Sequence, residues 1–252
     1  MNESPPVALD GKTALVTGAA RRIGAEICRT LHAQGMRIAI HYRGSADDAI
    51  SLADDLNAAR ADSARTFQGD LIETGTASGL IEAVIGWAGE LDVLVNNAST
   101  FYPTPLGDID EAAWVDLTGS NLKAPLFLSQ AAAPHLQAVG GSIVNIVDIH
   151  AMRPLKDHHV YGAAKAGLAM LTRSLAKDLA PAVRVNGVSP GAIAWPEDGI
   201  TEDTKAQILR EVPLGRTGSP TDIANAVLFL VRDATYSTGQ IIAIDGGRSV
   251  GW

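Results

Sequence analysis

The stretch TALVTGAARRIGAEI, at residues 13–27, joins a short apolar run, a glycine turn and the start of an amphipathic segment. The apolar run predicts a strand, and the segment from about Ile23 predicts a helix. Gly18 lies in the turn between them, and Gly24 lies in the first helical turn. Such a turn presents free backbone N–H groups that suit a pyrophosphate, although glycine also serves tight turns for steric reasons alone.

Six further short runs rich in β-branched residues alternate with longer helical patterns. Together with the first run they predict seven strands, at residues 13–17, 36–42, 64–70, 91–98, 141–147, 183–189 and 240–247. Nearly continuous apolar strands indicate burial on both faces, with helices as right-handed crossovers. We therefore expect an α/β protein with a doubly wound, seven-stranded parallel sheet, a Rossmann fold whose first turn would bind a dinucleotide.

The composition favours one domain. A chain of 252 residues with 46% hydrophobic content can bury one substantial core, so we expect a single domain over residues 11–252 after a flexible leader over residues 1–10. The leader resembles no signal peptide, and no apolar run is long enough to span a membrane. The lone cysteine, Cys28, excludes a disulfide framework. We expect a cytoplasmic protein, and the net charge of -8 argues against nucleic acid as a partner.

The residues after the second predicted strand indicate which dinucleotide would bind. An acid there would accept hydrogen bonds from the ribose hydroxyls and repel a 2′-phosphate. This chain has no acid until Asp47, and the residues before it are His41, Tyr42, Arg43, Gly44 and Ser45. Arg43 and Ser45 can hold a phosphate, so we predict NADPH; a solvated surface arginine is the alternative. Asp70 and Leu71, after the third strand, are expected at the adenine, unless Asp70 only caps the next helix.

A Tyr-x-x-x-Lys pair follows the fifth predicted strand. Tyr161 and Lys165 lie four residues apart, so on a helix their side chains share one face. The ammonium is expected to lower the pKa of the phenol and make it a usable acid near neutral pH. Asp148 comes directly after the strand. Alone, Tyr161 and Lys165 could be an ordinary surface pair, and Asp148 could simply form a turn or a cap. Their joint placement near the glycine turn predicts a catalytic site.

Several motifs together resemble the short-chain dehydrogenase/reductase family across essentially the whole chain. They are TGAARRIG at residues 17–24, NNAS at residues 96–99, Asn121, the Tyr161 and Lys165 pair, and SPG at residues 189–191. The resemblance implies that Asn121 holds a water in a proton relay, for which a satisfied core amide is the alternative, and that Lys165 orients the nicotinamide ribose. It also implies cofactor contacts from Gly18, Arg22, Ile23, Gly24, Asn97, Ala98, Ser99, Tyr161, Lys165, Pro190 and Gly191.

The usual catalytic serine of this family would fall at residue 148, where this chain has Asp148. This departure, with Arg22 in the glycine turn, HYRGS at residues 41–45 and NNASTFYPTPL at residues 96–106, looks like the pteridine reductase branch. The similar bacterial dihydromonapterin reductases keep the same Asp, Tyr and Lys arrangement. A carboxylate would repel the developing alkoxide of a carbonyl substrate, whereas a pterin C=N bond must gain a proton on nitrogen as hydride arrives at carbon.

We therefore expect an NADPH-dependent reductase of a dihydropterin, with dihydrofolate as a second candidate substrate. Phe101 is expected to stack on the flat heterocycle, unless it is an ordinary core aromatic. The resemblance implies that Ser99 and Arg22 hydrogen-bond the edge of the pterin, and Trp195 is a candidate for the pocket of the substrate's side chain. A general carbonyl or enoyl reductase and a catalytically idle NADP-binding sensor remain alternatives.

Two expectations concern metals and assembly. The spacing of His150, His158 and His159 fits no metal geometry, so we expect no metal site. The helices that carry Asn121 and Tyr161 are apolar on more than one face, which predicts burial against other subunits and a homotetramer.

Overall fold

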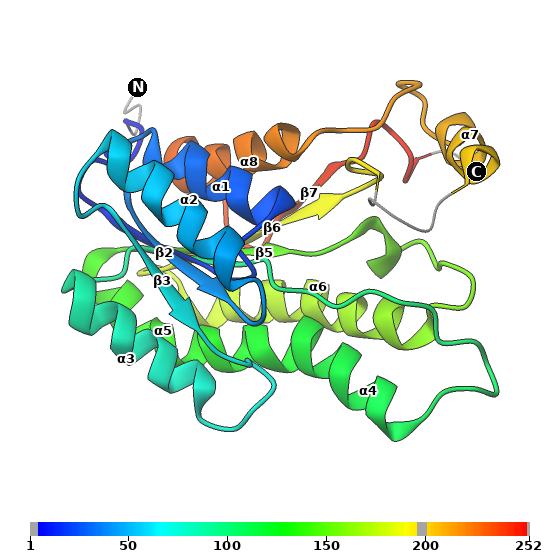
Figure 1. Cartoon of the computed structure of the whole chain (residues 1–252), viewed down its shortest axis with the longest axis horizontal. Coiled ribbons are helices and arrows are strands. Elements are labelled where there is room, and N and C mark those ends of the chain that lie inside the picture. The colour runs from blue at the N-terminus through cyan, green and yellow to red at the C-terminus, as the bar shows by residue number, and fades with distance from the viewer. Residues whose placement is uncertain (1–4, 196–200, 251–252) are drawn as a thin grey trace.

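Parallel strands form one seven-stranded sheet in the computed structural model, which describes residues 5–195 and 201–250 (Figure 1). The order across the sheet is β3-β2-β1-β4-β5-β6-β7, and every neighbouring pair is parallel. The strands are β1 (Thr13–Val16), β2 (Arg37–Tyr42), β3 (Ala64–Gln68), β4 (Val93–Asn96), β5 (Ser142–Ile146), β6 (Arg184–Pro190) and β7 (Ile241–Ile244). The predicted doubly wound Rossmann sheet is confirmed.

Helices cover both faces of the sheet (Figure 1). One face carries α1 (Arg22–His32), α2 (Ala46–Ala59) and α8 (Pro220–Leu228). The other carries α3 (Thr76–Ala88), α4 (Glu111–Thr118), α5 (Ala124–Val139) and α6 (His159–Leu179). The short helix α7 (Glu202–Arg210) lies away from both layers (Figure 1). The carboxyl ends of the strands are the edge where a doubly wound sheet binds its ligands.

Alternation along each strand supplies apolar side chains to both layers. In β1, Ala14 and Val16 join the core beneath α1 and α8, whereas Leu15 joins the core on the opposite face. In β4, Val95 joins the core beneath α1 and α8, and Leu94 joins the core on the opposite face. All five side chains are buried. Burial on both faces is what the continuous apolar runs predict, and it fixes the carboxyl ends of the central strands in place.

A π-helical turn, η1 (Gly119–Lys123), joins α4 to α5. It places one extra residue in a helical turn, and such turns often occur at functional sites. Asn121 lies in the middle of η1 and is fully buried. The local irregularity therefore determines where this candidate side chain points.

The start of the chain corrects one expectation. Residues 1–10 were expected to form a flexible leader, but Leu9 is buried in the core beneath α1 and α8. The backbone N–H of Val7 donates to the carbonyl oxygen of Arg232 at 2.8 Å, and the side chain of Val7 packs against the same core. The segment from Val7 onward thus belongs to the folded domain, because its apolar side chains have a surface to cover. Across the described residues, no helix has the length and apolar character required to cross a membrane.

Candidate active site

The turn between β1 and α1 is shaped by two glycines. Gly18 has a φ of +58°, and a Cβ there would lie 2.8 Å from Cα of Ala98. A Cβ on Gly24 would collide with the carbonyl oxygen of Gly18. Helix α1 begins at Arg22, and no side chain caps its first N–H groups. The turn therefore leaves backbone donors for a ligand, as expected for a pyrophosphate site.

Arg22 stands in this turn with a φ of +51°, in the left-handed region that favours glycine. For a residue with a Cβ, this conformation costs about 1–2 kcal/mol. Its guanidinium donates to the carbonyl oxygen of Ala194 at 3.4 Å. Strain of this kind persists where the surrounding structure imposes it, and it is common at ligand sites.

Side chains from neighbouring strands hold the turn. The backbone N–H of Gly18 donates to Nδ1 of His41 at 3.2 Å, and Nε2 of His41 lies 3.1 Å from the carbonyl oxygen of Gly69. Burial lowers the pKa of His41 to about 4, so the ring is neutral with its proton on Nε2. Asn97 donates to the carbonyl oxygens of Thr17 and Gly18, both at 2.9 Å. Both nitrogens of His41 are thus used by the protein itself.

A cleft of about 320 Å³ opens above this turn. Most of the predicted cofactor residues line it: Gly18, Arg22, Ile23, Gly24, His41, Arg43, Asp70, Leu71, Asn97, Ala98 and Ser99. We call it the turn cleft. Its lining residues follow the carboxyl ends of β1, β2, β3 and β4, the edge at which this fold binds dinucleotides.

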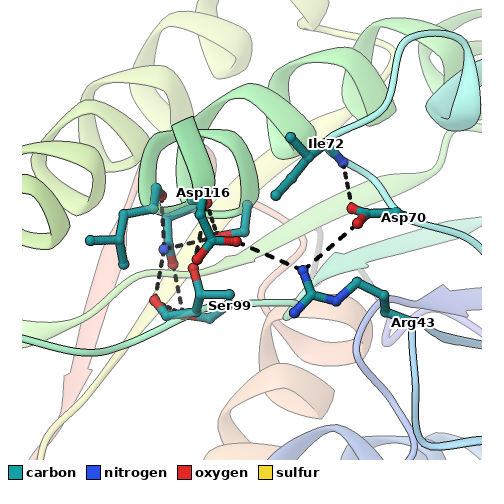
Figure 2. A network of polar contacts seen from close by, with 9 residues as sticks. Arg43, Asp70, Ile72, Ser99 and Asp116 are labelled. Carbon is teal, nitrogen blue, oxygen red and sulfur yellow. Dashed lines mark hydrogen bonds and ion pairs between the residues drawn. The ribbon is translucent and has the colours of Figure 1, made fainter. Parts of the chain in front are cut away.

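Arg43 crosses the outer end of the turn cleft between two carboxylates (Figure 2). Its Nη1 lies 3.8 Å from Oδ2 of Asp70 and 3.8 Å from Oδ1 of Asp116. The other oxygen of Asp70 accepts from the backbone N–H of Ile72 at 3.0 Å. Asp70 therefore holds the turn after β3 and also lines the cleft; it does not cap the next helix, because the N-cap of α3 is Gly75.

A second cleft of about 420 Å³ adjoins the first and shares Arg22, Ile23, Asn97 and Ser99 with it. We call it the tyrosine cleft. The other predicted residues in its wall are Phe101, Asp148, Tyr161, Lys165, Pro190, Gly191 and Trp195. The expected catalytic, nicotinamide and substrate residues are thus brought together from β4, β5, β6 and α6.

The centre of the tyrosine cleft is a short hydrogen bond. The hydroxyl of Tyr161 donates to Oδ2 of Asp148 at 2.6 Å, and the backbone N–H of His150 donates to Oδ1 of Asp148 at 2.8 Å. Tyr161 belongs to the first turn of α6, and its side chain is buried. The phenol and the carboxylate therefore act as one unit. The proton of this hydrogen bond belongs to the Tyr161 hydroxyl and points at Oδ2 of Asp148.

Lys165 lies beneath this pair. It is fully buried, and its Nζ donates to the carbonyl oxygen of Ile146 at 2.9 Å. The ammonium lies 5.7 Å from the centroid of the Tyr161 ring. Burial lowers the pKa of Lys165 to about 8, and the carboxylate of Asp148 partly opposes that shift.

The expected activation of the phenol by lysine is wrong for this structure. The pKa of Tyr161 is raised, first because the phenol is buried and second because the Asp148 carboxylate lies beside it. Lys165 cannot reverse this, since its N–H is directed at the backbone of Ile146. The phenol therefore keeps its proton at neutral pH. Its chemistry depends on Asp148 rather than on an ionised oxygen.

Comparison with known proteins places these clefts in a family. Residues 18–249 match a family model described as enoyl-(acyl carrier protein) reductase. The chain belongs to the short-chain dehydrogenase/reductase family. Pteridine reductase 1 of Leishmania tarentolae is 41% identical over 281 residues, covering 94% of this chain and 96% of the relative. A 3-oxoacyl-[acyl-carrier-protein] reductase, FabG, of Staphylococcus aureus is 37% identical over 240 residues, covering 94% and 97%. This member of the family is therefore an oxidoreductase, and the turn cleft fits a nicotinamide dinucleotide.

Two predicted residues lie behind the site of this oxidoreductase rather than in its wall. Asn121 is buried, and its Oδ1 accepts from the hydroxyl of Ser99 at 2.6 Å. Its Nδ2 donates to the carbonyl oxygens of Thr100 at 2.9 Å and Leu117 at 3.0 Å. This satisfied amide fixes Ser99, so the water-holding role remains a prediction. Tyr42 packs against the core beneath α1.

Ser45 forms the start of α2, and no hydrogen bond from its side chain caps that helix. Neither Ser45 nor Tyr42 belongs to the walls of the two clefts. Their predicted contacts with the cofactor remain predictions.

Phe101 has a neighbour that the sequence did not indicate. Its ring stacks on His158 with centroids 4.7 Å apart and an interplanar angle of 20°, and it meets Tyr161 at 4.8 Å and 79°. Phe101 remains 56% exposed, so it is not an ordinary core aromatic. His158 therefore supports one side of the ring, and the exposed surface of Phe101 is left for a ligand.

Other lining residues escaped the sequence analysis. In the turn cleft they are Arg21, Gly69, Ile72, Thr100 and Ser120. In the tyrosine cleft they include His150, Leu155, Ile193, Ile208 and Arg248. Arg21 follows the glycine turn directly and could have been found from its position; Ile208 and Arg248 come from distant segments. Part of the irregular stretch at residues 192–204 lies outside the described residues. Among the described residues, no group of three or more His, Cys, Asp or Glu side chains could hold a metal ion.

Proposed function

We propose that this short-chain reductase uses NADPH to reduce the C=N bond of a dihydropterin to the tetrahydro form. The observation that carries the proposal is the 2.6 Å hydrogen bond from the Tyr161 hydroxyl to the Asp148 carboxylate. A neutral serine hydroxyl would polarise a carbonyl at this position. A carboxylate paired with a protonated phenol suits a reaction in which a nitrogen gains a proton.

The charge of Asp148 favours one class of bond over the other. When a ring nitrogen is protonated, positive charge develops beside the acceptor carbon, and a nearby carboxylate stabilises that charge. When a carbonyl is reduced, negative charge develops on oxygen, and the same carboxylate opposes it. Tyr161 keeps its proton, because its pKa is raised by burial and by Asp148. The pair can therefore deliver a proton to nitrogen and take another from water.

The residues of the two clefts fit the proposed cofactor. The unhindered backbone donors at Gly18 and the start of α1 would hold the pyrophosphate, and Arg43 would hold the 2′-phosphate. Lys165, whose ammonium lies close to the wall of the tyrosine cleft, would orient the nicotinamide ribose. When bound, NADPH supplies the hydride. No acid follows β2 closely enough to take the place of Arg43 at the ribose, which supports NADPH over NADH.

The substrate side of the tyrosine cleft fits a flat heterocycle. Phe101 offers an exposed aromatic surface next to Tyr161, since His158 supports the other side of its ring. Ser99 is held by Asn121, so its hydroxyl oxygen remains available to accept a hydrogen bond from the pterin edge. Arg22 lines both clefts and can contact substrate and cofactor together. Trp195 lines the outer part of the same cleft and remains a candidate for the pocket of the substrate's side chain.

The relatives support two related activities. The similarity to a pteridine reductase agrees with the Asp148 argument. The similarity to 3-oxoacyl-[acyl-carrier-protein] reductases favours a second candidate, reduction of a ketone. A dihydromonapterin reductase differs from the first candidate only in the side chain of the pterin. Asp148 favours a pterin in either case, because a carboxylate opposes an alkoxide.

A spectrophotometric panel tests the proposal. Purified protein is mixed with NADPH or NADH and with dihydrobiopterin, dihydromonapterin, dihydrofolate or a simple β-keto thioester. We expect turnover of at least one of the first three with NADPH, and much slower turnover of the thioester. Efficient reduction of the thioester alone would refute the proposal in favour of a carbonyl reductase. Tight NADPH binding without turnover on any substrate would indicate an NADP-binding sensor.

We also propose that the enzyme is a homotetramer. Large apolar side chains are exposed on three helices of one face: Trp114 and Val115 on α4, Leu126 and Phe127 on α5, and Met170 on α6. Such side chains on adjacent helices favour burial against other subunits. Light scattering coupled to size-exclusion chromatography measures the subunit number. A monomer at micromolar concentration would contradict this assembly.

A further inference from the structure

We propose that Asp116 on α4 sets the preference of this enzyme between NADPH and NADH by competing with the 2′-phosphate for Arg43. The inference rests on the proposed role of Arg43 as the phosphate ligand. The inference adds Asp116 as a residue that determines cofactor specificity, although it lies about 70 positions after the end of β2 in the sequence. The basis is the geometry around one guanidinium nitrogen.

That nitrogen is Nη1 of Arg43, which lies between two carboxylates (Figure 2). It is 3.8 Å from Oδ2 of Asp70 and 3.8 Å from Oδ1 of Asp116. The Arg43 side chain is 55% exposed, whereas those of Asp70 and Asp116 are 37% and 32% exposed. The two carboxylates therefore attract the guanidinium from opposite sides, and it lies where solvent and a ligand can reach it.

Asp116 is a fixed partner rather than a mobile surface acid. It belongs to the last full turn of α4, and its carbonyl oxygen accepts from the hydroxyl of Ser120 at 2.9 Å. Burial raises the pKa of Tyr102, and the Asp116 carboxylate adds to that rise. The carboxylate of Asp116 thus lies within ion-pair distance of Arg43.

The charges determine the direction of the effect. One guanidinium and two carboxylates give this cluster a formal charge of -1 before any ligand arrives, and His41 at the base of the cleft is neutral. A 2′-phosphate adds further negative charge and must share Arg43 with both acids. NADH adds no such charge, and Arg43 keeps its carboxylate partners while NADH is bound. Asp116 therefore weakens NADPH binding more than NADH binding.

Asp70 cannot be used to test the same idea cleanly. Its second oxygen accepts from the backbone N–H of Ile72, so its replacement would also disturb the turn after β3. The hydrogen bonds that Asp116 accepts from Ser120 and Thr100, in the wall of the cleft, use its backbone carbonyl oxygen, which a side-chain replacement leaves in place. Asp116→Asn keeps the shape of the side chain, while it removes the charge.

The test measures dissociation constants of NADPH and NADH by fluorescence titration of the purified full chain without substrate. We expect Asp116→Asn to raise the preference for NADPH by about two- to fivefold, the range for a partly exposed charge pair. Glu111→Gln serves as the matched control, because it removes a charge from an exposed position in the first turn of the same helix. An unchanged preference, or a change equal to that of Glu111→Gln, would overturn the proposal, as would a shift towards NADH.

A double variant shows whether the effect passes through Arg43. In an Arg43→Ala background, Asp116→Asn should change the preference by much less than it does in the wild type. An equal change in both backgrounds would refute competition for Arg43. If Arg43→Ala itself leaves the preference unchanged while pterin turnover with NADPH persists, the phosphate site lies elsewhere. This inference then fails, while the proposed reaction stands. Binding is measured without a pterin, so failure of the pterin panel leaves this test intact.

Discussion

The two clefts share a wall but hold their charges in different ways. In the turn cleft, Arg43 and its acids are separated by 3.8 Å and remain partly exposed. In the tyrosine cleft, Asp148 and Tyr161 are 2.6 Å apart, and both Tyr161 and Lys165 are buried. Solvent screens the first set and leaves the second almost unscreened. Substitutions in the turn cleft should therefore change cofactor affinity in small steps, whereas substitutions of Asp148, Tyr161 or Lys165 should cause large losses of turnover.

The largest expected effect is at the buried pair. Asp148→Ser should reduce dihydropterin turnover by about 10²- to 10⁴-fold, because Tyr161 loses the carboxylate that shares its proton. Steady-state kinetics with NADPH measure the loss, and an unchanged dissociation constant for NADPH serves as the control for folding. An unchanged or increased dihydropterin turnover would show that the reaction does not need the carboxylate and would remove the proposed contrast between the clefts.

His41 tests whether burial or the choice of cleft makes a group sensitive to change, because it is a buried side chain in the more exposed turn cleft. Its pKa falls from 6.5 to about 4 on folding, so the unfolded chain takes up the proton first as the pH drops. The stability present above pH 6.5 should be lost progressively towards pH 4, by about 3 kcal/mol. Urea unfolding at pH 7 and pH 4.5 measures the change, and His41→Gln should lose less stability over this interval than the wild type. Equal losses would mean that His41 is not held neutral.

Arg43→Asp should have a smaller effect on binding. Replacing the guanidinium with a carboxylate should shift the ratio of kcat/KM values from NADPH towards NADH by about 10- to 100-fold, the range for a lost charge-assisted hydrogen bond. Turnover with NADH should stay close to that of the wild type. Unchanged relative efficiencies would mean that the phosphate is held by other groups, such as Arg21 at the same cleft.

The smallest effect concerns the pH profile. Burial lowers the pKa of Lys165 to about 8, so its ammonium form is present below that pH and is lost above it. We expect kcat/KM to fall about tenfold for each pH unit above pH 8, because the charged form of Lys165 is lost. Lys165→Arg, whatever its absolute rate, should remove the fall between pH 8 and 10, since a guanidinium stays charged. A fall that persists in Lys165→Arg would assign it to another group.

Local patterns predicted the sheet and the position of the site, because strand runs, glycine turns and a Tyr-x-x-x-Lys pair depend on nearby residues. They failed where the answer depends on contacts between distant segments. The raised pKa of Tyr161 needs the depth of its burial, and the support of Phe101 by His158 needs the packing of two loops. Asp116 meets Arg43 only after α4 has packed against η1 and α6. Leu9 joins the core for a similar reason.

The π-helical turn at Gly119–Lys123 has a consequence for protein engineering. Each residue of an α-helix adds about 100° of rotation, so deleting one residue here would make the α4 to α5 junction regular and turn Asn121 away from Ser99. Such a deletion would look favourable to any procedure that rewards regular helices. The resulting enzyme would gain helical hydrogen bonds and lose the fixed hydroxyl at its active site, an exchange of activity for stability. Thermostable variants of this enzyme should therefore be sought elsewhere in the chain.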